Sequence, residues 1–243
     1  MRDDALSVII CGSSAAIGMP AYLVWLRQEI DLSLRVLLTH SAERFLQPQV
    51  AAWHADEVFT SDDAGLNPTE FAMRSLGIVV LPATANMLAS AALGLAATPA
   101  QTVLLASNRP VLFFPSMNAT MWAKNSTQRH VAALRDEGHT VVEPQERAAF
   151  ELWQRDNVVG PALLPPDEAA ETILGWLENY LSATTAPALS DASGLVTNKT
   201  NPVGGLCTLG ETESTPSPCR PVPSPQPARR NSTSPAPNLG DRP

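Results

Sequence analysis

Two short stretches of this chain place amide, hydroxyl and thioether side chains directly after apolar runs. The first, PSMNATMW at residues 115–122, contains the amide of Asn118 beside the thioether of Met117. The second, LPATAN at 81–86, offers Thr84 and Asn86, which can donate hydrogen bonds to a carbonyl or a phosphate. Both stretches are poor in charge, so they suit a polar ligand that is held without strong ion pairs. For LPATAN the alternative is structural, with Thr84 as the N-cap of a helix.

A third stretch, CGSSAAIG at 11–18, also follows an apolar run. Its small residues let backbone N–H groups approach an anion, and a following helix N-terminus would favour negative charge. Gly12, Ser13 and Ser14 are therefore candidates for a phosphate site. The alternative is a tight turn whose serines cap the helix. The chain has neither the GxGxxG pattern nor the lysine of a phosphate-binding P-loop at this point.

The residue spacing gives little support for a metal site or for a histidine in the ligand site. The four histidines are His40, His54, His130 and His139, and none stands in metal-ligand spacing with another His or Cys. The three cysteines suggest neither a disulfide framework nor a nucleophile motif. We therefore expect no metal, and only His54, in an uncertain segment, remains a candidate for facing a ligand.

Apolar runs and helical patterns alternate along the chain. Strands are predicted at 6–12, 34–39, 77–82, 101–106, 110–115 and 139–144, and helices at 21–30, 83–96, 118–138 and 165–181. This alternation predicts an α/β fold, doubly wound around a mainly parallel sheet of the Rossmann or flavodoxin-like kind. In such folds ligands bind beyond the carboxyl ends of the strands, which is where the three polar stretches fall.

The composition divides the chain into two parts. Residues 1–182 are long enough for one domain with a sizeable core. Residues 183–243 are rich in Pro, Ser and Thr, and we predict a disordered C-terminal tail. The formal net charge of −8 argues against nonspecific nucleic-acid binding. No apolar run reaches membrane-spanning length and the N-terminus is a poor signal peptide, so a cytoplasmic protein without membrane contact is expected.

The ordered set of polar stretches resembles the homo-oligomeric flavin-containing Cys decarboxylases. LPATANM is similar to the Pro-Ala-Ser/Thr-Ala-Asn-Thr motif of that family, and PSMNATMW to its Pro-x-Met-Asn-x-x-Met-Trp motif. The resemblance covers about residues 6–181. It implies FMN as the cofactor, and assembly of the chain into a homo-oligomer, either a trimer or a dodecamer.

The resemblance also implies roles for individual residues. Asn118 would contact the carboxylate of a substrate cysteine, and Met117 would line the pocket over the flavin. In the family FMN oxidises the cysteine unit, after which CO2 leaves easily. The residues implied to bind FMN are Gly12, Ser13, Ser14, Thr39, Phe45, Thr84, Ala85, Asn86 and Ala106.

The segment after residue 144 indicates which branch of the family the chain resembles. Coenzyme A enzymes usually carry a Cys-containing, Gly-rich loop here, whereas residues 145–161 contain no Cys. They look more like the substrate clamp of the epidermin-type peptide decarboxylases, with Phe150, Glu151, Leu152 and Trp153 as the clamp residues. This resemblance implies a ribosomal precursor peptide with a C-terminal Cys as substrate. Its aminoenethiol product would form S-aminovinyl-cysteine in lanthipeptide biosynthesis, and other enzymes of that biosynthesis would be further partners.

The chain departs from the family pattern at two places. The active-site His of the family stands fourteen residues before the Pro of LPATAN, a position that Pro68 occupies here. The family's Asp-Asn-Leu-Leu-Thr is replaced by residues 97–101, Ala-Thr-Pro-Ala-Gln. Two alternatives therefore stay open. One is phosphopantothenoylcysteine decarboxylase, and the other is a catalytically silent regulatory flavoprotein.

Overall fold

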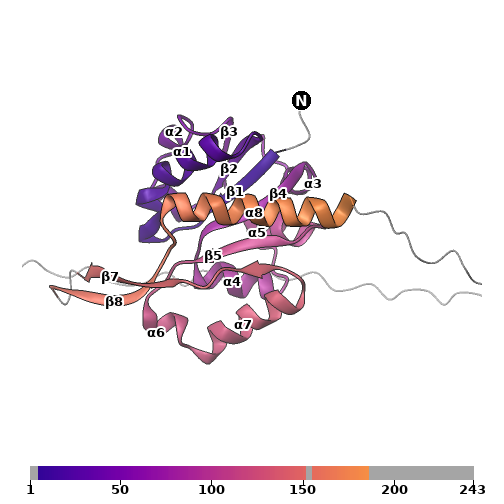
Figure 1. Ribbon diagram of the computed structural model, residues 1–243. Helices are drawn as coiled ribbons and strands as arrows, with labels where there is room; N and C mark the ends of the chain where they lie inside the picture. Colours follow the sequence, from indigo (N-terminus) through magenta and orange to yellow (C-terminus); the bar gives the residue numbers. More distant parts are fainter. Residues whose placement is uncertain (1–4, 152–154, 186–243) are drawn as a thin grey trace, which may run out of the picture. The chain divides into compact units, whose positions relative to one another are not determined.

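The central element of the fold is a parallel β-sheet. The computed structural model describes residues 5–151 and 155–185 of the chain. Six strands run parallel in the order β3-β2-β1-β4-β5-β6 (Figure 1). The predicted doubly wound α/β fold is therefore confirmed. The strands are β1 (Ala5–Ile10), β2 (Ser33–Leu38), β3 (Glu57–Thr60), β4 (Ser75–Ala83), β5 (Val111–Pro115) and β6 (Thr140–Val141).

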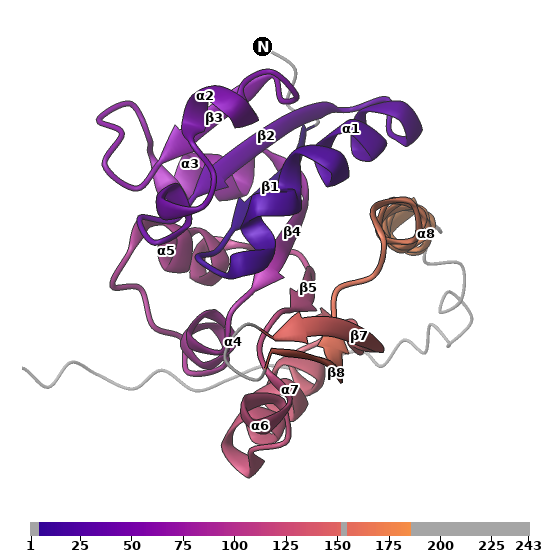
Figure 2. The same ribbon diagram turned by 90° about the vertical axis from the view of Figure 1, so that its left-hand side faces the viewer.

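Successive side chains along the strands point to opposite faces of the sheet and pack in two separate hydrophobic cores. In β1, Val8 packs in the core under one face of the sheet and Ile9 in the core under the other, and both are fully buried. Figure 2 shows the two helical layers on opposite sides of the sheet. One layer holds α1 (Met19–Glu29), α2 (Pro48–Ala51) and α8 (Pro166–Thr185), and the other holds α3 (Pro68–Met73), α4 (Ala85–Ala92), α5 (Pro99–Ala106) and α7 (Asn125–Asp136).

The remaining elements are short and lie near the strand ends. The 3-10 helices are η1 (Ser14–Gly18) and η2 (Ala42–Arg44), and a single-turn helix α6 (Ala119–Trp122) follows β5. The strands β7 (Gln145–Glu151) and β8 (Asp156–Ala162) form an antiparallel hairpin outside the main sheet. The sequence patterns predicted neither this hairpin nor the short strand β3.

One predicted strand is wrong. Residues 101–106 belong to helix α5, because the sequence before them contains strong helix-starting signals. Thr98 is the N-cap, Pro99 stands in the first turn, and Gln101 completes a capping box with Thr98. The predicted helix at 118–138 is likewise two helices, α6 and α7, and Gly138 follows α7 with a positive φ of 87°.

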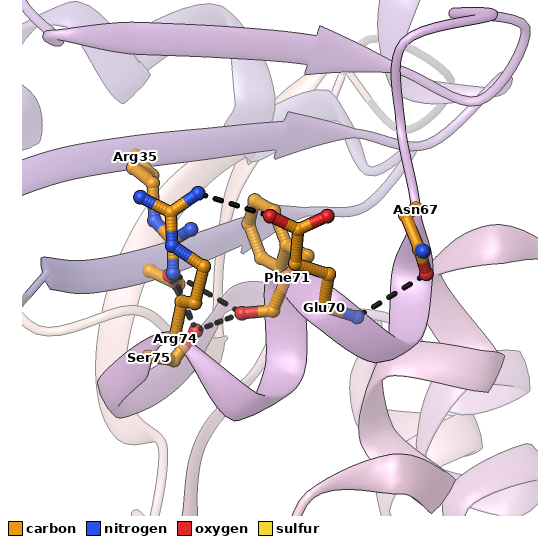
Figure 3. A network of polar contacts seen from close by, with 7 residues as sticks. Arg35, Asn67, Glu70, Phe71, Arg74 and Ser75 are labelled. Carbon is orange, nitrogen blue, oxygen red and sulfur yellow. Dashed lines mark hydrogen bonds and ion pairs between the residues drawn. The ribbon is translucent and has the colours of Figure 1, made fainter. Parts of the chain in front are cut away.

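Helix α3 is fixed to the sheet by a buried arginine (Figure 3). Arg35 of β2 is 5% exposed, and its Nη2 donates to the Phe71 carbonyl at 3.1 Å and to Ser75 Oγ at 3.0 Å. Its guanidinium also lies 4.6 Å from the centre of the Phe71 ring. Burial lowers the pKa of Arg35, and the neighbouring carboxylates Glu57 and Glu70 oppose that shift. This network holds the helix whose first residue is Pro68.

The predicted boundary between domain and tail stays a prediction. Helix α8 continues to Thr185, three residues past the expected boundary at 182, and residues 186–243 lie outside the described residues. Among the residues that the structure describes, no helix is long and apolar enough to cross a membrane.

Candidate active site

A cavity of about 370 Å³ opens beyond the carboxyl ends of four neighbouring strands. Cys11 follows β1, Thr39 follows β2, Ser61 follows β3 and Thr84 follows β4, and all four residues line it. The N-terminal turn of α5 completes the wall with residues 97–99 and 101. The volume is within the range of small-molecule and cofactor sites.

The loop after β1 is packed tightly against the loop after β2. A Cβ atom on Gly12 would lie 2.4 Å from Ser41 Oγ, so a larger residue would displace the second loop. Ser13 is the N-cap of η1, where its Oγ accepts a hydrogen bond from the Ala15 N–H at 3.3 Å. The capping alternative is therefore realised for Ser13. Gly12, Ser13 and the exposed Ser14 stand beside the cavity and are not among its lining residues.

Thr84 has both of the roles considered from the sequence. It is the N-cap of α4, where its Oγ1 accepts from the Met87 N–H at 3.3 Å, and it also lines the cavity. Asn86, on the first turn of the same helix, lines the cavity as well, while Ala85 between them does not. Thr39 donates its hydroxyl to the Ile10 carbonyl at 3.2 Å, which fixes that side chain at the strand end.

Asn118 is held in one orientation by the helix that it caps. Its Oδ1 accepts from the Met121 N–H at 2.8 Å, so Nδ2 is the end of the amide that can donate to a ligand, and the residue is exposed. Ser116, two residues earlier, lies 2.7 Å from Ser13, oxygen to oxygen, which brings this stretch to the loop after β1. Met117 packs partly buried against the core beside α4. Neither Met117 nor Asn118 lines the cavity of the same chain.

The ionisable side chains in the cavity wall are few. They are Cys11, His40 and Asp62, and no Lys or Arg lines the cavity. Burial raises the pKa of Cys11 from 9.0 to about 12, against weaker opposing hydrogen bonds to Thr84, so the thiol is neutral at physiological pH. His40 Nδ1 lies 3.6 Å from Asp62 Oδ2 at the exposed rim. Sequence patterns missed His40, Asp62 and Gln101 as wall residues; the capping-box spacing of Thr98 and Gln101 was the one available signal.

Other residues singled out from the sequence lie away from this cavity. Ala106 is the last residue of α5, at the end opposite the cavity, and Phe45 follows η2, 39% exposed. His54 lines a different cavity, between α1 and the residues that follow α2. Pro68 is the first residue of α3, after the N-cap Asn67.

The expected clamp residues are only partly within the described chain. Phe150 and Glu151 lie in strand β7, whereas Leu152 and Trp153 lie outside the described residues. Within the described residues, the His, Cys, Asp and Glu side chains form no group of three that could hold a metal ion.

The wall chemistry fits a flavin mononucleotide better than a metal or a highly charged ligand. Hydroxyls of Thr39, Thr84 and Thr98 and the amide of Asn86 can hydrogen-bond the polar edges of such a cofactor. The apolar side chains of Met87 and Pro99 can contact its flat ring.

Curated proteins similar in sequence include mersacidin decarboxylase and a coenzyme A biosynthesis protein. The chain is 30% identical over 195 residues to the mersacidin decarboxylase of Bacillus sp. (strain HIL-Y85/54728), an alignment that covers 78% of this chain and 97% of the relative. It is also 30% identical to the coenzyme A biosynthesis bifunctional protein CoaBC of Bacillus subtilis (strain 168), but spans only 47% of that protein.

Solved structures with a similar fold include SpaF and EpiD. The FMN-dependent cysteine decarboxylase SpaF has a TM-score of 0.60 at 28% identity, and the match covers 73% of this chain and 98% of that one. A variant of EpiD in complex with the substrate peptide DSYTC has a TM-score of 0.66 at 24% identity, covers 70% and 98% of the two chains, and supports the fold.

The match to a protein family extends over most of the folded part. Residues 1–166 match the flavoprotein family, and these residues contain all four strands whose ends form the cavity. The similarity to mersacidin decarboxylase, which covers 97% of that protein, supports the same family. The chain belongs to the flavoprotein family, in the branch with the lantibiotic peptidyl-cysteine decarboxylases.

Proposed function

We propose that this chain is an FMN-dependent decarboxylase of a C-terminal peptidyl cysteine. The observation that carries the proposal is the cavity at the strand ends, where Thr39, Thr84 and Asn86 meet in a chain of this family. The product is a peptide ending in an aminoenethiol, as required for an S-aminovinyl-cysteine ring.

The cofactor is held by neutral groups. FMN supplies the oxidising chemistry, and the protein binds, orients and desolvates it. The hydroxyls of Thr39 and Thr84 and the amide of Asn86 bind its polar groups in the cavity. Gly12, Ser13 and Ser14 bind its phosphate beside the cavity. The close approach of Gly12 to Ser41 supports this role, since it gives the backbone of the loop a fixed position.

Asn118 binds the substrate carboxylate. Its capping bond to the Met121 N–H uses Oδ1, so Nδ2 is the donor from which a carboxylate can accept a hydrogen bond. A neutral donor orients the carboxylate without the strong ion pair that would stabilise the ground state against loss of CO2. Met117, beside it, lines the apolar side of the same site.

The hairpin of β7 and β8 supports a peptide as the substrate. Residues 145–151 and 156–162 form two antiparallel strands, and the sequence 145–162 contains no cysteine, so this segment has no thiol to reduce the product. A free peptide aminoenethiol is then the end product. Phe150, Glu151, Leu152 and Trp153 are proposed to hold the peptide.

A regulatory flavoprotein without catalysis is a second candidate, and Pro68 favours it. This residue starts α3 and has no side-chain group that transfers a proton. The family's histidine at this position would supply general acid–base help, which accelerates reactions by roughly 10²- to 10⁴-fold. Its replacement by Pro68 therefore slows a reaction but need not abolish it.

Purified protein separates these candidates. A flavin absorbance spectrum that copurifies with the chain, followed by turnover of peptides ending in Cys but not of phosphopantothenoylcysteine, supports the proposal. Turnover of phosphopantothenoylcysteine alone would instead favour the coenzyme A reaction. Flavin binding with no turnover of either substrate would favour the regulatory candidate.

The chain is also proposed to assemble with copies of itself. Leu93, Leu95 and Leu105 are 62%, 49% and 58% exposed, and we call them the leucine surface. A Cβ on Gly94 would lie 3.8 Å from Leu105 Cδ1, so the ends of α4 and α5 meet there. Exposed apolar surfaces of this kind mark association sites. The turn that leads from this surface also supplies Ala97 and Thr98 to the cavity wall.

A further inference from the structure

We propose that Gln101 is a positioning residue for the cofactor, holding the segment 97–98 as one wall of the cavity. The inference rests on the proposed function, because it takes FMN as the occupant of the cavity. It concerns the place where the chain carries Ala-Thr-Pro-Ala-Gln, residues 97–101.

The side-chain amide of Gln101 uses both of its ends inside the protein. Its Oε1 accepts from the Ala97 N–H at 2.9 Å and from the Thr98 N–H at 3.1 Å. Its Nε2 donates to Ser90 Oγ at 2.8 Å. The residue is only 7% exposed, so these bonds have little competition from water. One side chain thus fixes two consecutive backbone groups of the wall.

The three bonds tie together two helices that start at the cavity. Ser90 belongs to α4, whose N-cap Thr84 lines the cavity, and Thr98 is the N-cap of α5. The Gln101 N–H donates to Thr98 Oγ1 at 3.4 Å, which leaves the Thr98 hydroxyl proton as a donor toward a ligand. Without Gln101, residues 97–98 would lose their side-chain link to α4.

Backbone bonds tie the start of the segment 93–97 to α4, with the Leu95 N–H donating to the Ser90 carbonyl at 2.9 Å. Residues 93–97 connect the two helices, and Gly94 adopts a positive φ of 63°. Thr102 Oγ1 approaches the Ala96 carbonyl at 3.4 Å, a long bond on the exposed side. We therefore expect the wall position to depend mainly on Gln101, and cofactor affinity to depend on the wall.

The test compares FMN affinity in matched variants. Gln101→Met keeps the length of the side chain and removes all three bonds. Gln101→Glu keeps the two accepted bonds and still forms a capping box with Thr98. Apoprotein of each variant is titrated with FMN at 20 °C while flavin fluorescence is followed, and the apoprotein melting temperature is recorded beside it. We expect the Kd of Gln101→Met to rise about 10-fold or more, and that of Gln101→Glu to stay within about 3-fold of wild type.

Ser75→Ala is the control for general destabilisation. It removes a buried polar side chain from the Arg35 network at the start of β4, away from the cavity. We expect a lower melting temperature with unchanged FMN affinity. If Gln101→Met does not fold, Ser90→Ala replaces it, since this change removes only the anchor to α4 and should raise the Kd by about 3-fold.

The outcomes are distinguishable. Unchanged FMN affinity in Gln101→Met, or in Ser90→Ala if that variant replaces it, would overturn the positioning role and leave the proposed function standing. Weakened affinity in Ser75→Ala equal to that of Gln101→Met would also overturn it, because any loss of stability would then suffice. A wild-type protein that binds no FMN would overturn the proposed function and this inference together.

Discussion

At the residue scale, the proposed function uses capping residues as ligand contacts. Thr84, Thr98 and Asn118 each accept a bond from a helix N–H, and each keeps a proton to donate outward. The cap fixes the side chain and so lowers the entropy lost when a ligand binds. The functional and structural interpretations of these residues are therefore compatible. For Thr84 this explains why the sequence alone left both interpretations open.

Replacing Asn118 by Asp tests this double use. Asp still caps α6, but it places an anion where the substrate carboxylate should bind. We expect kcat/KM for a peptide ending in Cys to fall by roughly 100-fold or more, in line with loss of a hydrogen bond to a charged group. The flavin spectrum should be unchanged, which separates substrate binding from folding. Retained kcat/KM in this variant would contradict the assigned role.

The buried thiol of Cys11 should make stability depend on pH at alkaline values. Its folded pKa of about 12 lies above the ordinary value of 9.0, so the folded state keeps the proton that the unfolded chain releases. Stability is therefore unaffected below pH 9.0 and falls as pH rises toward about 12, by about 1.4 kcal/mol per pH unit. Urea unfolding at pH 8 and pH 10 should show a smaller loss in Cys11→Ala than in wild type. Equal losses in the two proteins would argue against a buried neutral thiol.

At the element scale, the long buried strands and the terminal helix were predictable, while short or capped elements were not. Strand β4 contains the apolar run Ile78–Leu81, whose β-branched residues favour a strand. The run at 101–106 is equally apolar, and only the caps Thr98 and Gln101 show that it is a helix. The hairpin of β7 and β8 carries few buried residues, so hydrophobic pattern could not reveal it.

The residues of the cavity wall were also predictable only in part from local sequence patterns. Thr84 and Asn86 were predictable because they follow a clear strand. His40 and Asp62 reach the cavity through the packing of loops, which no local pattern encodes, and for Gln101 the capping box with Thr98 was the available signal. Ala106 was assigned to the cofactor by the family resemblance. As the last residue of α5, it lies at the far end of that helix.

The packing of α8 on the sheet can be tested with two glycines. A Cβ on Gly77 of β4 would lie 2.6 Å from Leu177 Cδ2 and 3.0 Å from Trp176 Cζ3, so Gly77→Val should displace α8. We expect a loss of about 1–3 kcal/mol in the free energy of unfolding, measured by urea denaturation.

Gly175 is the matched control within α8. A Cβ there would meet no atom within 4 Å, and alanine favours a helix over glycine. Gly175→Ala should therefore raise the free energy of unfolding by about 0.5–1 kcal/mol. Equal stability of the two variants would show that α8 is not packed on β4 as described.

At the scale of the whole molecule, the parallel sheet explains why stretches far apart in sequence form one site. The carboxyl ends of β1, β2, β3 and β4 lie side by side at one edge, so the loops after residues 10, 38, 60 and 83 converge there. Asn118 follows β5 at the same edge but lies outside the cavity wall.

Association of the chain with copies of itself can be tested at the scale of the whole molecule. Leu105→Glu places a charge in the leucine surface, at a side chain that is 58% exposed in one chain. We expect the variant to fold but to elute as a smaller species, measured by size exclusion with light scattering. Arg129→Glu, a charge change on α7, is the control and should leave the mass unchanged. An unchanged mass for Leu105→Glu would exclude this surface as the contact between copies.

The most direct measurement is the mass change of a peptide ending in Cys after incubation with the purified, flavin-containing protein. Oxidative decarboxylation without later reduction predicts a loss of about 46 Da, the mass of CO2 plus two hydrogens. A loss of about 44 Da would mean that the product is reduced again, against the cysteine-free segment 145–162. No mass change with any peptide ending in Cys would contradict the proposed function itself.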